Sequence, residues 1–250
     1  GHCPVDALLL EILESPMGTD HSAAAGMAGM QALKALGVRL VEDDLGAGYS
    51  SLIRLRHWPF DRVKIDQAIV KQVADDPLRT LRFIRQLVRL GHDLELEVVV
   101  EGLETPGLIE AALWLGADMG QGYALARPMP PAALPRWLDG FRWEGDAASP
   151  ATALGALASA LQWEEQLLAL PSEPEFWRHH SECTRATGRY LDSALQGKAS
   201  LHELRAAHAA MHAAALAGPH DAQYRQHRMR FLDLLIELVR LEEHSCASAA

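Results

Sequence analysis

The chain has 250 residues and a formal net charge of -10, and 49% of its residues are hydrophobic. This length is enough for one large domain or two smaller ones, each with its own core. The absence of a lysine- or arginine-rich block argues against duplex nucleic acid as a partner. We also expect no membrane-spanning segment, because no apolar stretch approaches the roughly 20 residues that a spanning helix needs. The three cysteines are sparse and form no paired framework, which suits a reducing cytoplasm.

Strands and helices alternate along the first half of the chain. Strand-like apolar runs are predicted at residues 7–13, 38–44, 62–66, 97–101 and 118–123, with helices at 22–36, 50–57, from 75 onward and at 105–116. This alternation predicts parallel strands joined by helices. Five such strands fit either part of an eight-stranded β/α barrel or an open doubly wound sheet. No glycine-rich nucleotide-binding motif supports a nucleotide-binding version of the open sheet, and the pattern of elements predicts an α/β fold of either kind.

Charged and amide side chains stand at the ends of these runs. Asp43 and Asp44 close the second run, and Lys64, Glu101 and Gln121 lie at the ends of later ones. Adjacent aspartates at a strand end are costly without a neighbouring cation, and a divalent metal is a common solution. A solvated acidic turn is the alternative for the Asp-Asp pair alone. Because barrel active sites lie at the C-terminal ends of the strands, the whole set indicates an active site.

Five motifs occur in order between Leu8 and Pro130. They are L-x-L-E-I-x-E-S, D-D-x-G-A-G-Y-S-S-L, K-I-D, V-V-x-E-G-x-E-T, and Q-G-Y followed by R-P-x-P. Together they resemble the EAL-type cyclic-di-GMP phosphodiesterase domain over roughly residues 8–143. The resemblance implies a modified TIM barrel that hydrolyses cyclic-di-GMP to the linear dinucleotide pGpG. It also implies a two-metal site for Mg²⁺ or Mn²⁺, and hard carboxylate ligands suit either ion.

The resemblance assigns roles by position. Metal-binding carboxylates are matched by Glu11, Asp43, Asp44 and Glu101. Catalytic positions are matched by Lys64, Glu101, Glu104 and Gln121. The lysine would orient or activate the attacking water, Glu101 would sit at the metal site as a candidate general base, and the glutamine would help to hold the water.

The family also has a supporting glutamate, which Glu104 matches and which holds the loop after Asp44. Glu104 could instead cap the helix that begins near Thr105. Asp66, in the K-I-D strand, is expected to make structural hydrogen bonds.

The family's namesake Glu-Ala-Leu motif and its asparagine ligand lie on earlier strands and have no match here. The resemblance therefore implies that residues 1–146 are the C-terminal part of the domain, an α/β fold with a partial TIM-type barrel of about five strands. This part lacks about three barrel strands, and we expect it to be inactive or severely impaired alone. Open sheet edges would favour poor solubility or association, and a homodimer is also plausible by resemblance. The alternative is a non-catalytic cyclic-di-GMP receptor or interaction module, against which the retained Asp43, Asp44, Lys64 and Glu101 argue. An unrelated barrel enzyme would require five coincidental motifs.

The composition changes near residue 147, where alanine, leucine, histidine and glutamate begin to dominate. Helices are predicted at residues 150–170, 174–195, 200–217 and 221–244. The short connections between them predict an antiparallel all-α four-helix bundle over residues 147–250.

Histidine and cysteine side chains in this segment could bind zinc. His208 and His212 share a helix face, and His180 and Cys183 are three residues apart on the preceding helix. The pattern resembles the chemoreceptor zinc-binding domain, a sensory module that uses one cysteine and three histidines. It departs from that family at Ala160, where a histidine is expected. The alternative is a plain bundle with partly exposed histidines, serving a sensory or dimerisation role.

Overall fold

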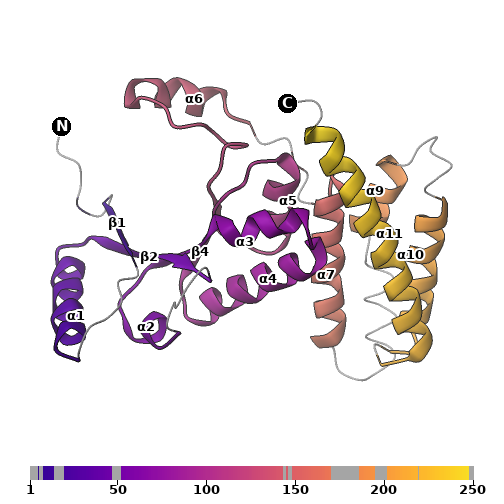
Figure 1. Ribbon diagram of the computed structural model, residues 1–250, viewed down its shortest axis with the longest axis horizontal. Helices are drawn as coiled ribbons and strands as arrows, with labels where there is room; N and C mark the ends of the chain where they lie inside the picture. Colours follow the sequence, from indigo (N-terminus) through magenta and orange to yellow (C-terminus); the bar gives the residue numbers. More distant parts are fainter. Residues whose placement is uncertain are drawn as a thin grey trace.

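A computed structural model gives the three-dimensional arrangement of most of the chain. It describes residues 5, 8–13, 20–46, 52–142, 145, 148–169, 186–194, 202–218 and 220–247. These residues form a parallel sheet with surrounding helices, followed by a second, helical segment (Figure 1). Within them, no helix combines the length and apolar character needed to cross a membrane.

Five parallel strands form the sheet in the order β1-β2-β3-β4-β5. Their bounds are β1 Leu9–Ile12, β2 Arg39–Leu45, β3 Arg62–Ile65, β4 Glu97–Val100 and β5 Met119–Gly120. The central strands β3 and β4 are buried on both faces, with Val63, Ile65 and Val98 fully enclosed. Near-continuous apolar strands of this kind are typical of parallel sheets covered by helices. The predicted five-stranded parallel sheet is therefore confirmed.

Strand β5 is shorter than the predicted run of residues 118–123. A Cβ at Gly122 would lie 2.2 Å from the backbone oxygen of Leu103, so the chain passes very close to that residue. The backbone then turns, and the amides of Leu125 and Ala126 donate to the carbonyl of Gly122 at 3.1 Å. This turn against Leu103 ends the strand early.

Six α-helices accompany the sheet in the described residues. They are α1 Asp20–Ala35, α2 Leu52–His57, α3 Gln67–Lys71, α4 Pro77–Asp93, α5 Pro106–Trp114 and α6 Leu134–Gly140. Helix α4 begins as predicted, with the Asp76 side chain accepting from the Arg79 amide at 3.1 Å and proline in the first turn. Its Leu81, Ile84 and Val88 are buried in the core, where α4 packs on β3 and β4. The short helix α3 was not predicted; Asp66 caps it.

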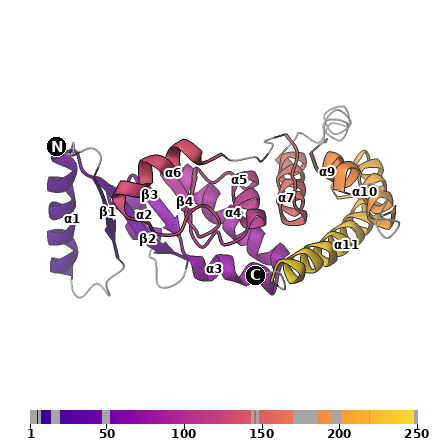
Figure 2. The ribbon, with the colours of Figure 1, turned by 90° about the horizontal axis from the view of Figure 1, so that it is seen from above.

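The second segment consists of helices α7 Ala153–Ala169, α9 Ala186–Ala194, α10 His202–Ala215 and α11 Ala222–Ala247. Helix α11 packs along α10 and against α7, and α9 packs on α7. Figure 2 shows α9, α10 and α11 at the end of the molecule opposite α1. Helices are thus present in all four predicted regions, and most of the second predicted helix lies outside the described residues.

The two segments meet where α5 packs on α7. The buried carboxylate of Glu110 on α5 accepts hydrogen bonds from the amides of Ala151 and Thr152, at 2.7 and 2.9 Å, and from the Thr152 hydroxyl at 2.6 Å. Gly155 allows this approach, since a Cβ there would lie 2.1 Å from a Glu110 oxygen. The hydrophobic core continues from the sheet into α7 across this junction.

Candidate functional site

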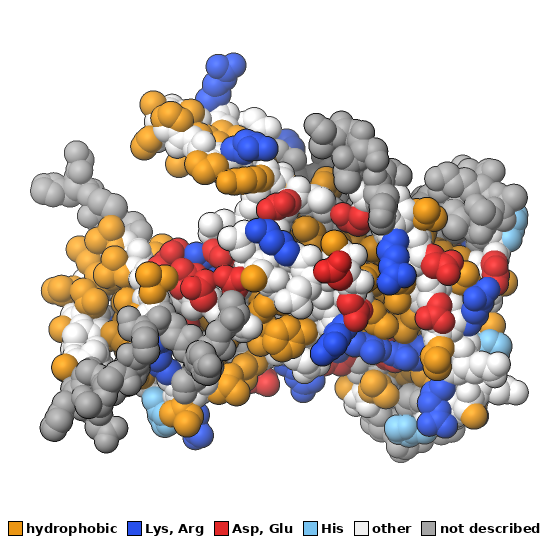
Figure 3. Space-filling model, in the orientation of Figure 1, with side chains coloured by type: hydrophobic (Ala, Val, Ile, Leu, Met, Phe, Trp, Pro, Cys, Tyr) orange, Lys and Arg blue, Asp and Glu red, His pale blue; other side chains and the backbone are white. Residues whose placement is uncertain are grey.

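The side chain of Lys64 lies at the centre of the predicted site. It projects from the C-terminal half of β3, and its Nζ lies 3.0 Å from Glu11 on β1, 3.3 Å from Asp43 on β2 and 2.5 Å from Glu101 after β4. Four neighbouring strands therefore each contribute one charged group at the same edge of the sheet. Acidic side chains gather over this part of the molecule in Figure 3. The structure thus brings together four of the residues identified from the sequence.

An irregularity in β2 positions the paired aspartates. The pairing register with β3 shifts between Glu42 and Leu45, and Asp44 has φ of 62°, an uncommon value for a residue other than glycine. In a regular strand, adjacent side chains point to opposite faces. A bulge redirects side chains, and bulges are frequent beside active sites. Here it lies at the two positions predicted to bind metal.

Asp44 contacts Asp66 rather than Lys64. The pKa of Asp44 rises to about 6, chiefly because it shares a hydrogen bond with Asp66. Burial and the charges of Asp43, Asp66 and Glu101 raise this pKa further. Asp66 also accepts from the Ala68 amide at 2.5 Å, so its expected structural hydrogen bonds are present.

The ammonium of Lys64 stays protonated although only 8% of its side chain is exposed. Burial lowers the pKa of Lys64, but hydrogen bonds from its ammonium to Glu101 and Glu11 outweigh burial, with help from the charge of Asp43. The net result is a pKa above the usual lysine value. The site therefore holds a fixed positive charge among carboxylates.

The donor chemistry at this site fits a hard divalent cation. Oδ1 of Asp43 is buried and makes no hydrogen bond, and the cation that it faces is the Lys64 ammonium, 3.3 Å away. Carboxylate oxygens of this kind are the ligands that Mg²⁺ and Mn²⁺ prefer. In the described part of the chain, however, no three His, Cys, Asp or Glu side chains are arranged to hold a metal ion. The carboxylates converge on the Lys64 ammonium instead.

A cavity of about 600 Å³ lies beside this cluster. Three residues named from the sequence, Glu101, Glu104 and Gln121, line it. Further lining residues that could contact a ligand are Gln67, Lys71, Tyr123, Arg127 and Trp137. Glu101 therefore faces both Lys64 and the cavity. The mixture of aromatic rings, two cations and two amides could accommodate a ligand with flat rings and negative charge.

Glu104 does not cap the following helix. The N-cap of α5 is Thr105, whose hydroxyl accepts from the Leu108 amide at 3.2 Å. The alternative role considered for Glu104 is therefore wrong. Its other predicted role, support of the loop after Asp44, involves residues 47–51, which lie outside the described residues.

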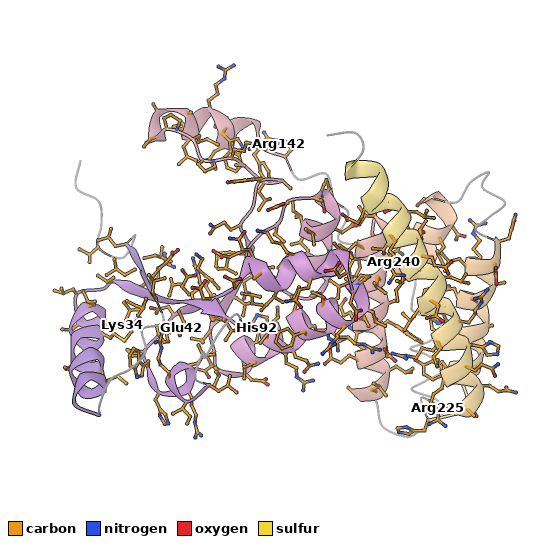
Figure 4. The ribbon with its side chains drawn as sticks, in the orientation of Figure 1. Lys34, Glu42, His92, Arg142, Arg225 and Arg240 are labelled. Atoms are coloured by element: carbon orange, nitrogen blue, oxygen red, sulfur yellow. The ribbon has the colours of Figure 1, made fainter. Side chains whose placement is uncertain are left out.

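Sequence reasoning missed a buried ion pair next to the aspartates. Arg54 Nη2 on α2 donates to both oxygens of Glu42, at 2.6 and 2.5 Å, and both side chains are almost fully enclosed. Glu42, labelled in Figure 4, directly precedes Asp43 on β2. The pair therefore joins the two elements on either side of the glycine turn. The available signal in the sequence was Glu42 itself, because a glutamate inside an apolar strand needs a buried partner.

The structure brings His208 and His212 together in the helical segment. Their Nε2 atoms are 3.0 Å apart, and the His208 ring also contacts Phe231. Burial lowers the pKa of His208 to about 4, so this imidazole is neutral near pH 7. The other two predicted zinc ligands, His180 and Cys183, lie outside the described residues.

Comparison with known proteins identifies relatives of the first half of the chain. An uncharacterised signalling protein from Caulobacter vibrioides is 43% identical over 133 residues, which cover 52% of this chain and 16% of that protein. Cyclic di-GMP phosphodiesterase RocR from Pseudomonas aeruginosa is 36% identical over 129 residues, which cover 52% of this chain and 32% of RocR. The chain thus spans a third or less of the length of these relatives.

A solved structure and a family profile cover the same region. The crystal structure of the EAL domain of Mycobacterium smegmatis DcpA matches with a TM-score of 0.51 and 30% identity, covering 56% of this chain and 61% of that domain. The sequence profile of the EAL domain matches residues 1–128, which include Glu11, Lys64, Glu101 and Gln121. This match extends over half of the chain, and the chain therefore belongs to the EAL domain family.

Proposed function

We propose that residues 1–146 contribute the C-terminal part of a TIM-type barrel that hydrolyses cyclic-di-GMP to pGpG. The main supporting observation is that Lys64 contacts Glu11, Asp43 and Glu101 at the C-terminal ends of adjacent parallel strands. Fixed charges at this edge are what a barrel active site requires. The phosphodiesterase activity in RocR's name also supports the proposal.

Four carboxylates would hold the divalent ions, Mg²⁺ or Mn²⁺, when these bind. They are Glu11, Asp43, Asp44 and Glu101. The ions would neutralise the phosphodiester and generate the attacking hydroxide.

The chain's own residues then act on the phosphodiester. The ammonium of Lys64 stabilises negative charge that develops on the phosphoryl oxygens during in-line attack. Glu101 lies between Lys64 and the cavity, so it is placed to accept a proton from the attacking water. The P–O3′ bond breaks, the departing O3′ takes up a proton from solvent, and the products are a 3′-hydroxyl and a 5′-phosphate. Gln121 lines the same cavity and would hold the water in line.

The cavity beside Glu101 would bind the rest of the dinucleotide. Lys71 and Arg127 supply positive charge for a phosphate, and Tyr123 and Trp137 supply rings on which guanine can stack. The guanidinium of Arg127 lies 4.9 Å from the centre of the Tyr123 ring, which fixes the two side chains as one surface.

The test measures pGpG formation with Mn²⁺ for two proteins. One is this chain, for which we expect weak or no turnover, because the Glu-Ala-Leu strand has no match in it. The other is a chimera in which residues 1–128 replace the matching part of RocR, which supplies the remaining strands. We expect the chimera to form pGpG and its Lys64→Met variant to lose almost all activity.

Each outcome separates the candidate functions. A chimera that binds cyclic-di-GMP without hydrolysing it would favour the receptor alternative. A chimera that neither binds nor hydrolyses the dinucleotide, although its circular dichroism spectrum shows it folded, would contradict both.

We propose for residues 147–250 a helical bundle with a sensory or dimerisation role and a zinc site. The 3.0 Å separation of the Nε2 atoms of His208 and His212 supports it, since two imidazole nitrogens this close can share one zinc ion. Cys183 and His180 would complete the ligands. Titration with zinc against a chromophoric chelator should give one tight site that His208→Ala abolishes. Loss of binding in His202→Ala, an exposed histidine on the same helix, would contradict the assignment.

A further inference from the structure

Arginines follow one face of α4 where it meets the helical segment. Arg82, Arg85 and Arg89 are spaced by three and four residues, which places them on one side of the helix. They face Glu164 and Glu165 on α7. Figure 3 shows basic side chains grouped where α4 and α7 adjoin. These arginines pair with α7 and do not line the cavity beside Glu101, so they belong to a different part of the surface from the site described above.

Two carboxylates are shared among four guanidiniums at this junction. Glu165 pairs with both Arg85 and Arg89, the latter at 2.8 Å. Glu164 pairs with Arg228 of α11, whose Nη2 lies at 2.8 Å, and with Arg82 at 3.6 Å. Arginine does not lose its proton in proteins, so the cluster keeps two positive charges in excess. This excess is notable in a chain whose formal net charge is -10.

The side chains surround an open recess of about 600 Å³. Arg85 is largely buried, and its Nη1 donates to the carbonyl of Leu161 at 2.5 Å, which fixes its position. Arg82 and Arg89 are more exposed, so their guanidiniums can reorient toward a ligand. Each guanidinium has five N–H donors, and the pairs with glutamate use only some of them.

We propose that this recess binds a small ligand through a phosphate group. Arginine forks match phosphate oxygens two at a time, and four of them converge here from α4 and α11. Leu161 and Leu168 provide an apolar wall for the remainder of a ligand. The phosphate could be inorganic or part of a nucleotide. The recess is lined by α4 of residues 1–146 and by α7 and α11 of the helical segment, so a bound ligand would contact both segments.

The test is isothermal titration calorimetry of the whole 250-residue chain with inorganic pyrophosphate. EDTA is present, so that divalent ions cannot hold the anion at the strand-end carboxylates, and ionic strength is constant. We expect saturable binding at one site, weakened at least tenfold in Arg82→Ala/Arg89→Ala. The matched control is Arg79→Ala, which removes an exposed arginine of α4 that does not line the recess.

A second variant distinguishes a ligand site from a structural ion-pair network. Glu165→Gln removes a carboxylate that competes for Arg85 and Arg89, so the proposal predicts tighter pyrophosphate binding, by threefold or more. A purely structural network predicts lower thermal stability and no gain in binding. The proposal is overturned if the unmodified chain binds no pyrophosphate, or if Arg79→Ala weakens binding as much as the double variant.

A parallel titration with ADP identifies the source of the phosphate. Tighter binding of ADP than of pyrophosphate assigns the recess to a nucleotide, and equal or weaker binding assigns it to an inorganic phosphate.

Discussion

The two parts of the molecule bury ionisable groups in opposite ways. Lys64 at the strand ends is surrounded by the carboxylates of Glu11, Asp43 and Glu101, and its pKa is raised. His208 in the helical segment is packed against aromatic rings, including Phe231, and its pKa is lowered to about 4. One group is therefore charged at neutral pH, and the other is neutral.

Burial acts in the same direction on both groups, since it lowers the pKa of any cationic acid. The difference is the number of opposing charges that the fold supplies. Parallel strands end at one edge, so each strand adds a charged side chain to the same place. A helix face brings together residues four apart, here two histidines. The sheet is thus suited to stabilising charge on a phosphodiester, and the helices to offering neutral nitrogen ligands.

The largest effect is expected when the charge at the strand ends is removed. Lys64→Met in the RocR chimera should lower the rate of pGpG formation by about 10³-fold, the scale for loss of a group that stabilises transition-state charge. Mn²⁺ should also raise the melting temperature of the Lys64→Met chain more than that of the unmodified chain, because the carboxylates have lost their cation. An unchanged rate would show that Lys64 is structural.

The buried pair beside the site should be nearly as sensitive. Arg54→Leu removes the bidentate partner of the enclosed Glu42 carboxylate and should cost about 3–5 kcal/mol of unfolding free energy, measured by urea denaturation. Glu42→Leu/Arg54→Leu should recover most of this loss, because an apolar pair needs no countercharge. Equal stabilities for the single and double variants would contradict the account.

Lowering the pH should destabilise the folded chain, because His208 in the helical segment is buried in its neutral form. The folded pKa of His208, about 4, is below the ordinary histidine value of 6.5, so the unfolded chain binds the proton more readily. Stability is retained above pH 6.5 and lost as the pH falls toward 4, by roughly 3 kcal/mol at the limit. His208→Leu should reduce this loss in urea titrations at pH 7.5, 6 and 5. An unchanged pH dependence would show that the histidine is not buried.

A smaller effect is expected at the junction of the two parts. Gly155→Ala would place a methyl group against the Glu110 carboxylate, which hydrogen bonds hold in place, at a cost of about 1–3 kcal/mol. The control, Gly29→Ala, lies inside α1 with no atom within 4 Å of the new methyl. It should stabilise the chain by about 0.5–1 kcal/mol. Destabilisation of similar size in both variants would argue against a tight junction.

Much of the sheet could be predicted because its signals are local. Apolar runs predicted the strands, and glycines at helix ends and the Asp76-Pro77 pair at a helix start predicted the helices between them. The charged residues at the ends of the apolar runs then located Lys64 and Glu101. The roles of individual residues came instead from the resemblance to the EAL family.

The rest depends on contacts that the sequence does not encode locally. The bulge requires a left-handed backbone at Asp44, a conformation that aspartate adopts more readily than most residues but that is uncommon for any residue other than glycine. The pairing of Glu42 with Arg54 crosses a turn, and the arginines of α4 resemble an ordinary solvated helix face until α7 is placed beside them. These features appear only once the tertiary packing is known.

The most direct test compares two glutamates of one strand segment in the RocR chimera. Glu101 lies at the C-terminal end of β4 beside Lys64, and Glu97 lies at the other end, paired with Arg62. Glu101→Gln should abolish Mn²⁺-dependent formation of pGpG, and Glu97→Gln should leave the rate within about twofold, since it lies away from the site and exposed substitutions have small effects. Full activity in Glu101→Gln, or an equal loss in both variants, would contradict an active site at the C-terminal strand ends.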